Sequence, residues 1–266
     1  MENIFISAKQ AASDRFSYGA SSFIGDRDEQ QDYACICVNN YCLLATVCDG
    51  MGGANGGKAA SSAAISTIIG SFKTVGNRYI ESPNSFLYRT ASKANKLVAQ
   101  TLKGSVGGTT IVAAIIQDSK LYWFSAGDSR LYIYRTGELL QVTRDHNYLL
   151  RLDELKRLGK ISETQYKEET QRGDALISYL GLGDLELYDL ALNGVNIISG
   201  DVILLATDGL YKIVPDNELG RMLSRVTTGD ELAKALIEKV KMSVNDAEPH
   251  NATAADDNGR HSLSPC

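Results

Sequence analysis

Two segments of the chain are apolar runs that end in Asp-Gly. The first covers residues 41–50 and ends in Asp49-Gly50, and the second covers residues 201–209 and ends in Asp208-Gly209. Each run has the length and composition of a buried β-strand, and the glycine allows the chain to turn sharply after the acid. We therefore expect strands that carry carboxylates to the edge of a sheet, where a cluster of acids would hold divalent metal ions.

Strand-like segments dominate the rest of the chain, and three helical segments interrupt them. The predicted strands cover residues 17–24, 32–38, 41–48, 109–116, 120–125, 130–135, 138–142, 186–192 and 202–207. The predicted helices cover residues 56–72, 84–102 and 230–244. The strands between 120 and 142 follow one another closely, as in an antiparallel meander. This order predicts an α+β sandwich instead of a doubly wound parallel sheet.

Residues 146–174 differ in character from the strands on either side. They are charged and amphipathic, which predicts a helical excursion from the surface. Long inserts in compact domains are often functional, so we expect this one to be a flap over a site. No linker rich in Pro, Gly or Ser divides the chain, and we therefore expect a single domain over residues 1–266.

The composition excludes some classes of partner. The 266 residues carry a formal net charge of -5, which argues against nucleic acid or an anionic membrane as the main partner. No apolar run approaches the roughly 18 residues that a spanning helix needs, and the first residues lack the pattern of a signal peptide. We expect a monomeric cytoplasmic protein without a membrane span.

Five acids are placed as metal ligands often are, at the end of a strand or in a turn that contains glycine. They are Asp32, Asp49, Asp128, Asp208 and Asp257. Each of them alone is a common turn residue or helix cap. The three histidines have no metal-ligand spacing between them, so carboxylates, carbonyls and water would form the site. Such ligands suit Mg²⁺ or Mn²⁺ and do not suit zinc or copper.

Five short motifs follow one another in an order that is known from one protein family. They are the segment from Arg27 to Asp32, then Asp49-Gly-Met-Gly-Gly53, Gly107-Gly-Thr-Thr110, Gly127-Asp-Ser-Arg130 and Asp208-Gly-Leu210. Together they resemble the metal-dependent serine/threonine protein phosphatases of the PPM family (type 2C), bacterial type. The resemblance covers residues 17 to about 240. It implies a four-layer α-β-β-α sandwich, in which helix pairs flank two antiparallel sheets, with two metal ions at one end.

The resemblance also implies a role for each matching residue at the metal site. Asp49 would bridge two Mn²⁺ or Mg²⁺ ions, the Gly50 carbonyl would bind one of them, and Asp208 would bind the other. Asp128 would hold a third, weaker ion or support the site indirectly. Asp32 would act through metal-bound water.

The activity that the resemblance implies is direct hydrolysis of phosphoserine and phosphothreonine in signalling proteins, with a cognate Ser/Thr kinase as a partner. Metal-activated water would attack phosphorus, with Asp49 and Asp208 as catalytic ligands. Arg27 would grip the phosphate through its bidentate guanidinium. No cysteine is followed by arginine six residues later, which agrees with a reaction that forms no covalent phosphoenzyme.

The chain departs from the family pattern at three places. Met51 stands where many members have a histidine that is proposed as a general acid, and Gln30-Gln31 replaces an Asn and an acid. The family ends with Asp-Asn-x-Thr before an apolar strand, and that Asp is a metal ligand. Asp257-Asn258 is the best match, but residues 245–266 contain no such strand. An alternative alignment on residues 250–253 would lose the acid altogether, so we expect a weakened site or a less stable sheet.

Two other functions compete with this interpretation. Residues 52–58 satisfy most of the P-loop pattern of nucleotide-binding enzymes, but Ala59 replaces the Ser or Thr that binds Mg²⁺. The second alternative is a binding module that has the phosphatase fold and a catalytically weakened metal site, and the departures described above favour it.

Overall fold

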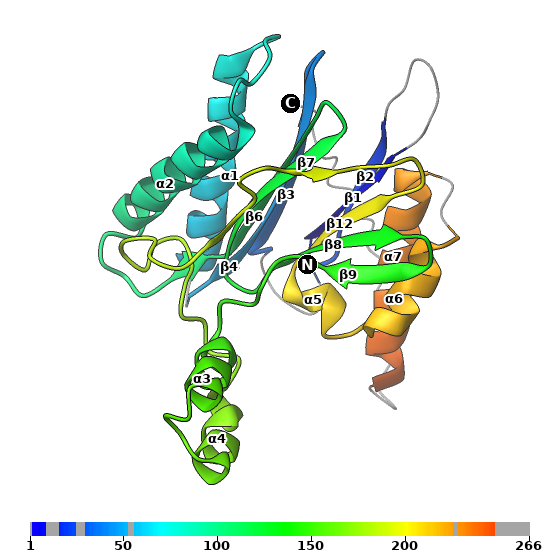
Figure 1. Cartoon of the computed structure of the whole chain (residues 1–266). Helices are drawn as coiled ribbons and strands as arrows, with labels where there is room; N and C mark the ends of the chain where they lie inside the picture. Colours follow the sequence, from blue (N-terminus) through cyan, green and yellow to red (C-terminus); the bar gives the residue numbers. More distant parts are fainter. Residues whose placement is uncertain (1, 9–15, 25–29, 53–55, 226–227, 248–266) are drawn as a thin grey trace, which may run out of the picture.

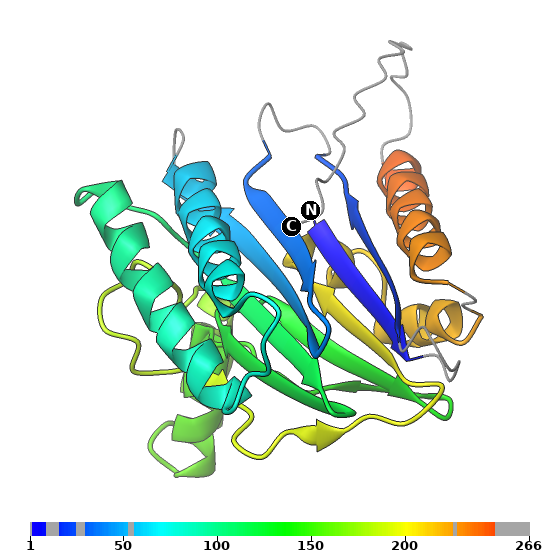
Figure 2. The ribbon, with the colours of Figure 1, turned by 90° about the horizontal axis from the view of Figure 1, so that it is seen from above.

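The protein is a sandwich of two antiparallel sheets with helices on both outer faces (Figures 1 and 2). This computed structural model describes residues 2–8, 16–24, 30–52, 56–225 and 228–247, with only the backbone for 2–8 and 244–247. Figure 2 looks along the layers, with one helix pair on each side of the sheets. The predicted four-layer α+β sandwich is confirmed.

The larger sheet has seven strands and carries the first helix pair. Its main path has the order β10-β7-β6-β4-β3, with β11 also paired to β7 and β5 to β4. The strands are β3 (Asp32–Val38), β4 (Cys42–Met51), β5 (Gly108–Thr109), β6 (Ile111–Gln117), β7 (Lys120–Ala126), β10 (Asp189–Leu190) and β11 (Val195–Asn196). Helices α1 (Gly56–Val75) and α2 (Pro83–Leu102) pack on its outer face. The strand predicted over 186–192 is shorter, because only β10 pairs with the sheet there.

The smaller sheet has five strands in the order β2-β1-β12-β8-β9. The strands are β1 (Glu2–Ala8), β2 (Phe16–Ser22), β8 (Arg130–Arg135), β9 (Glu138–Gln141) and β12 (Val202–Ala206). Helices α6 (Asp216–Leu223) and α7 (Gly229–Ala247) cover its outer face. Strand β1 was not predicted from the sequence, and it occupies an interior position between β2 and β12.

Strand β12 is apolar throughout, and β4 is apolar from Cys42 to Cys48 apart from Thr46, because both faces of each strand are buried. Alternate side chains of a strand point to opposite faces of the sheet. In β4, Leu44 belongs to the core under α1 and α2, and Leu43 belongs to the core between the sheets. In β12, Leu205 faces the other sheet and Leu204 faces α6 and α7. Full burial of each Leu side chain stabilises the folded state by about 1.5–3 kcal/mol. Packing on both faces therefore holds the ends of β4 and β12 in place.

The insert predicted over residues 146–174 is helical. It forms α3 (Tyr148–Arg157), α4 (Glu163–Glu169) and a 3₁₀ turn η1 (Thr170–Arg172), and it projects away from the sandwich (Figure 1). The side chain of Asn147 caps α3, and Ser162 forms a capping box with Gln165 at the start of α4. The insert therefore stabilises its own helices through local hydrogen bonds.

The sheets also decide between two of the predicted functions. Strand β4 pairs antiparallel with β3, β5 and β6. A P-loop follows a strand of a parallel sheet, so the nucleotide-binding alternative based on residues 52–58 is wrong. No helix within the described ranges has the length and apolar character that crossing a bilayer requires.

Candidate metal centre

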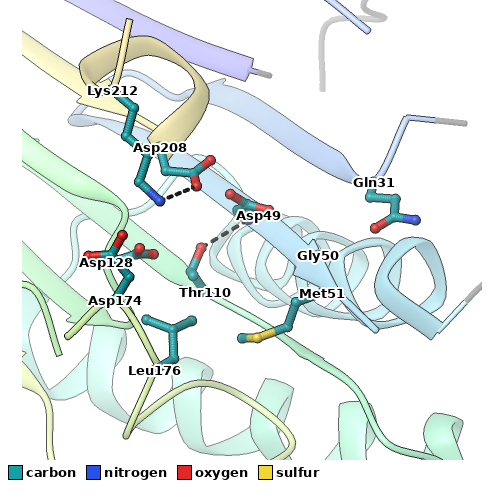
Figure 3. Close-up of a pocket in the computed structure, with 10 residues that line it drawn as sticks. All are labelled: Gln31, Asp49, Gly50, Met51, Thr110, Asp128, Asp174, Leu176, Asp208 and Lys212. Carbon is teal, nitrogen blue, oxygen red and sulfur yellow. Dashed lines mark hydrogen bonds and ion pairs between the residues drawn. The ribbon is translucent and has the colours of Figure 1, made fainter. Parts of the chain in front are cut away.

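Three carboxylates meet where strands of the two sheets end. Asp32 and Asp49 are direct partners in the antiparallel pairing of β3 with β4. Asp208 follows β12 as the first residue of α5 (Asp208–Tyr211). The side chain of Asp49 is within hydrogen-bonding distance of both Asp32 and Asp208. Figure 3 shows Asp49 and Asp208 on one wall of a cavity.

The carboxylates repel one another electrostatically. The pKa of Asp49 is raised to about 9, chiefly by burial and in addition by the negative charges of Asp32 and Asp208. Without a cation the protonated form of Asp49 is therefore favoured. Among the described residues, no group of three or more Asp, Glu, His or Cys is already arranged so that it could hold a metal ion. The donor set nevertheless fits a hard divalent cation, whose charge would favour the ionised form of Asp49.

The backbone of Asp49 is fixed by two adjacent threonines. The Thr110 hydroxyl accepts the Asp49 N–H at 3.0 Å, and the Thr110 N–H donates to the Asp49 carbonyl oxygen at 2.9 Å. The Thr109 hydroxyl also donates to that carbonyl oxygen, at 2.9 Å. Ser129 Oγ lies 2.7 Å from Thr110 Oγ1. The Gly-Gly-Thr-Thr and Gly-Asp-Ser-Arg motifs thus hold the strand end that presents Asp49.

Gly50 lies where helix α1 approaches the end of β4. A Cβ atom at Gly50 would clash with the carbonyl oxygen of Gly57, and one at Gly57 would clash with Gly50 in turn. The Gly50 N–H donates to the Gln31 carbonyl oxygen at 3.1 Å. Only a residue without a side chain allows this close approach, which brings the start of α1 against the carboxylates.

Asp128 and Lys212 lie on the opposite side of the cavity from Met51 (Figure 3). Burial raises the pKa of Asp128 to about 6, and the charge of Asp208 contributes to the rise. Lys212 Nζ forms an ion pair with Asp208 Oδ2 at 2.9 Å. Burial opposes the charged form of Lys212, but this hydrogen bond and the nearby acids raise its pKa. Lys212 thus supplies positive charge to this group of acids.

A network around Arg130 joins the Asp128 turn to α5. Arg130 makes a bidentate ion pair with Asp145, at 2.9 and 2.6 Å, and its guanidinium lies 3.6 Å from the centroid of the Tyr211 ring. The Tyr211 hydroxyl donates to the Asp128 carbonyl oxygen at 3.1 Å. Asp128 and Asp208 come from distant parts of the chain, and this network fixes their relative positions.

The cavity has a volume of about 370 Å³. Its lining residues are Gln31, Asp49, Gly50, Met51, Thr110, Asp128, Asp174, Leu176, Asp208 and Lys212 (Figure 3). Asp174 comes from the end of the helical insert, so the insert contributes an acid to the site. The volume is that of a small-molecule site, and the lining is dominated by polar groups.

The structure brings most of the predicted site residues together. Asp49, Gly50, Asp128 and Asp208 line the cavity, and buried Asp32 contacts Asp49 and accepts a hydrogen bond from the Thr207 hydroxyl at 3.0 Å. The remaining predicted residues, Arg27 and Asp257, lie outside the described part of the chain, as does most of the atypical C-terminus.

No role for Thr110, Asp174 or Lys212 was predicted from the sequence. A signal for Lys212 was present, because it follows Asp208 by four residues and such residues are neighbours on a helix. Thr110 was part of a quoted motif. No local pattern marks Asp174, since only the folding of the insert brings it to the cavity.

Comparison with known proteins agrees with this geometry. The profile described as "Protein phosphatase 2C" matches residues 21–247. The serine/threonine phosphatase Stp of Listeria monocytogenes is 31% identical over 202 residues, which is 74% of this chain and 77% of the relative. The sequence-based prediction of the enzyme class, a metal-dependent serine/threonine phosphatase, is therefore confirmed at the level of the family.

Solved structures show the same fold. The serine/threonine phosphatase Stp1 from Staphylococcus aureus superposes with a TM-score of 0.68 at 25% identity, over 84% of this chain and 88% of that one. The catalytic domain of the phosphatase PstP, solved in complex with two manganese ions, gives a TM-score of 0.63 at 22% identity, over 91% and 94% of the two chains. The motifs, the sandwich and these matches agree, and the chain belongs to the protein phosphatase 2C family.

Proposed function

We propose that this protein removes phosphate from phosphoserine and phosphothreonine in other proteins, with two Mn²⁺ or Mg²⁺ ions bound at the carboxylate cluster. The observation that carries the proposal is the contact of Asp49 with both Asp32 and Asp208. Three acids in contact need compensating positive charge, and the cavity beside them is open to a phosphate group. The related phosphatase PstP was solved in complex with two manganese ions, which supports the proposal of two ions at this site.

Asp49 and Asp208 would be direct ligands of these ions. Asp49 would bridge both of them, the Gly50 carbonyl would bind one, and Asp208 would bind the other. Asp32 would act through bound water, and Asp128 would bind a weaker third ion or orient the others. Bound cations of this kind lower the pKa of water, so that hydroxide is available near neutral pH. Arg27 would hold the phosphate and Asp257 would add a further ligand, and both assignments remain predictions.

The other groups of the cavity position these acids. Thr110, itself held by Ser129, keeps the Asp49 backbone in place, so the carboxylate does not need to reorganise during the reaction. Lys212 neutralises part of the charge on Asp208. Met51 lines the cavity and has no proton to donate, so it does not protonate the leaving oxygen.

The helical insert would act as a flap that contacts the substrate protein. Its Asp174 lines the cavity, and its helices project from the catalytic edge (Figure 1). The physiological substrates would be phosphoproteins of a Ser/Thr kinase pathway.

Hydrolysis of a phosphothreonine peptide tests this proposal. The metal-free protein would be assayed with Mn²⁺, with Mg²⁺ and with a chelator. We expect hydrolysis with at least one of the two metals and only background with the chelator. Equal rates under all three conditions would contradict the proposal and favour the alternative of a phosphatase-fold binding module. Calorimetric titration with Mn²⁺ would count the bound ions independently of activity.

A further inference from the structure

Helix α2 carries only basic charges, and they share one face. Arg89, Lys93, Lys96 and Lys103 follow one another at intervals of four, three and seven residues, which places them in one row along a helix. Helix α2 contains no Asp or Glu, although the whole chain has a net charge of -5. We call this row, from Arg89 to the C-cap residue Lys103, the basic row.

The packing of α2 fixes the basic row on the outside of the molecule. The opposite face of the helix is buried in the core against α1 and the seven-stranded sheet through Leu87, Ala91, Ala94, Val98 and Leu102. The row residues are exposed, and within the described residues none of them forms an ion pair. Figure 2 shows α2 at the outer margin of its helix layer. The positive charge is therefore available to a partner.

The surface along the basic row is hollowed and partly apolar. A groove of about 450 Å³ runs along this face, lined by Tyr88, Ser92, Leu97 and Gln100 together with three row residues. Tyr88 and Leu97 are each 40% exposed. Exposed aromatic and aliphatic groups beside basic groups suit a peptide chain that carries acids and some apolar side chains.

The basic row leads toward the catalytic cavity. Leu102, at the end of α2, packs against Gly107, and the next residue, Gly108, pairs with Met51 in β4. Met51 lines the cavity. Lys103 and Gly108 are five residues apart, so their Cα atoms are separated by at most ~18 Å. The row itself is about 21 Å long, because a helix rises about 1.5 Å per residue.

We propose that the basic row docks an acidic segment of the phosphoprotein substrate while the phosphorylated residue occupies the cavity. This inference rests on the proposed phosphatase function and adds a substrate class to it. An extended chain advances about 3.3 Å per residue, so a segment of about six residues covers the row. A spacer of about five residues then reaches the cavity. The overall negative charge of the chain disfavours nucleic acid and anionic membranes as occupants, whereas a short acidic peptide contacts only this row.

Three phosphothreonine peptides test the proposal. The first carries a run of Glu and Asp five residues before the phosphothreonine, the second carries the run five residues after it, and the third has Gln and Asn instead of the acids. We expect kcat/KM with Mn²⁺ to be about tenfold higher for one of the acidic peptides than for the neutral one, as several surface ion pairs together can supply. Added salt should reduce this preference.

A charge-reversal variant identifies the surface responsible. In R89E/K93E/K96E the preference should disappear, while kcat/KM for the neutral peptide and for p-nitrophenyl phosphate stays within about twofold of wild type. The matched control K73E/K120E/K234E changes the net charge equally at exposed positions elsewhere and should keep the preference. Circular dichroism would verify that both variants are folded.

A binding measurement separates this proposal from the phosphatase assignment. Fluorescence anisotropy with labelled, unphosphorylated versions of the peptides requires no catalysis. If the wild type with Mn²⁺ hydrolyses no peptide faster than it does with a chelator, the phosphatase proposal fails. Binding of the acidic peptide would still test the docking proposal in that case. The docking proposal is overturned if the wild type binds acidic and neutral peptides equally, or if R89E/K93E/K96E keeps the preference. It is also overturned if duplex DNA or anionic vesicles displace the acidic peptide more effectively than its own unlabelled form.

Discussion

Asp49 and Asp208 both follow a buried apolar run of residues and both precede glycine, yet their surroundings differ. Strand β4 continues for two residues after Asp49, and the Asp49 backbone is held by hydrogen bonds with Thr109 and Thr110. The charges nearest to it are negative, and its pKa is raised to about 9. Asp208 begins the short helix α5, and its side chain is 33% exposed and pairs with Lys212.

The difference lies in what each acid needs in order to ionise. Asp208 has Lys212 beside it, whereas the charges that act on Asp49 within the described residues, those of Asp32 and Asp208, are negative. A metal ion would therefore change the protonation of Asp49 most. The same sequence pattern thus produces an acid surrounded by negative charge and an acid that is already partly neutralised by Lys212.

The largest expected effect comes from removing either carboxylate. Asp49→Asn and Asp208→Asn should each lower kcat/KM for a phosphothreonine peptide by at least about a hundredfold, because each loses a charged metal ligand. Asp49→Asn should be the more severe, since no other group can replace a bridging position. Asp118→Asn, at the far end of β6, is the control and should be close to wild type. Near-full activity of Asp208→Asn would show that the ligand assignment is wrong.

The pH dependence of stability tests the surroundings of Asp49 without an activity assay. The folded pKa of Asp49, about 9, is above its ordinary value near 3.8. Folding is therefore favoured by this group at low pH, and the contribution is lost as the pH rises from about 4 to 9. We expect thermal unfolding of the metal-free protein to occur at lower temperature as the pH rises through this window.

Two comparisons isolate Asp49 as the cause of that loss. Asp49→Asn should have a flatter profile, because an amide does not titrate. Mn²⁺ should restore the stability of the wild type at pH 8 and should do so much less for Asp49→Asn. A wild-type profile as flat as that of the variant would contradict the raised pKa.

The strongly patterned parts of the fold were predictable from the sequence. Strands β4 and β12 are apolar on both faces, and α1 has a long run of small and apolar residues, so local pattern and tertiary packing agree. Helices α5 and α6 were missed because they are short and α6 contains Gly220. Strand β1 was not predicted because it is short and its large apolar residues are only Ile4, Phe5 and Ile6.

The site was predictable where a strand end defines it. Asp32 and Asp208 begin elements and Asp49 lies near the end of β4, so their proximity followed from the topology. Asp174 could not be identified in this way, because its position depends on how the whole insert packs. Lys212 could have been identified from its spacing to Asp208, since an acid and a lysine four residues apart on a helix commonly pair.

An intermediate effect is expected at Thr110, which supports only the Asp49 side of the comparison. Thr110→Val removes the hydroxyl that accepts the Asp49 N–H and leaves that buried donor without a partner. The free energy of unfolding should fall by about 1–3 kcal/mol, and kcat/KM should fall about tenfold as Asp49 becomes less well positioned. Chemical denaturation and peptide hydrolysis measure the two effects. Thr110→Ser keeps the hydroxyl and should retain most of the wild-type stability and kcat/KM. If it does not, the losses in Thr110→Val come from altered packing and not from the lost hydrogen bond.

The smallest effect concerns the cation beside Asp208. Lys212→Met removes a positive charge that competes with metal ions for Asp208 and that also lies near Asp128. The site becomes more negative, so we expect the Kd for Mn²⁺ to decrease by about threefold to tenfold, as measured by calorimetry. Lys241→Met, which breaks an exposed pair with Glu238 in α7, is the matched control and should leave the Kd unchanged. Weaker Mn²⁺ binding in Lys212→Met would mean that Lys212 orients Asp208 as a ligand instead of competing for it. The difference between Asp49 and Asp208 would then be one of geometry and not of charge.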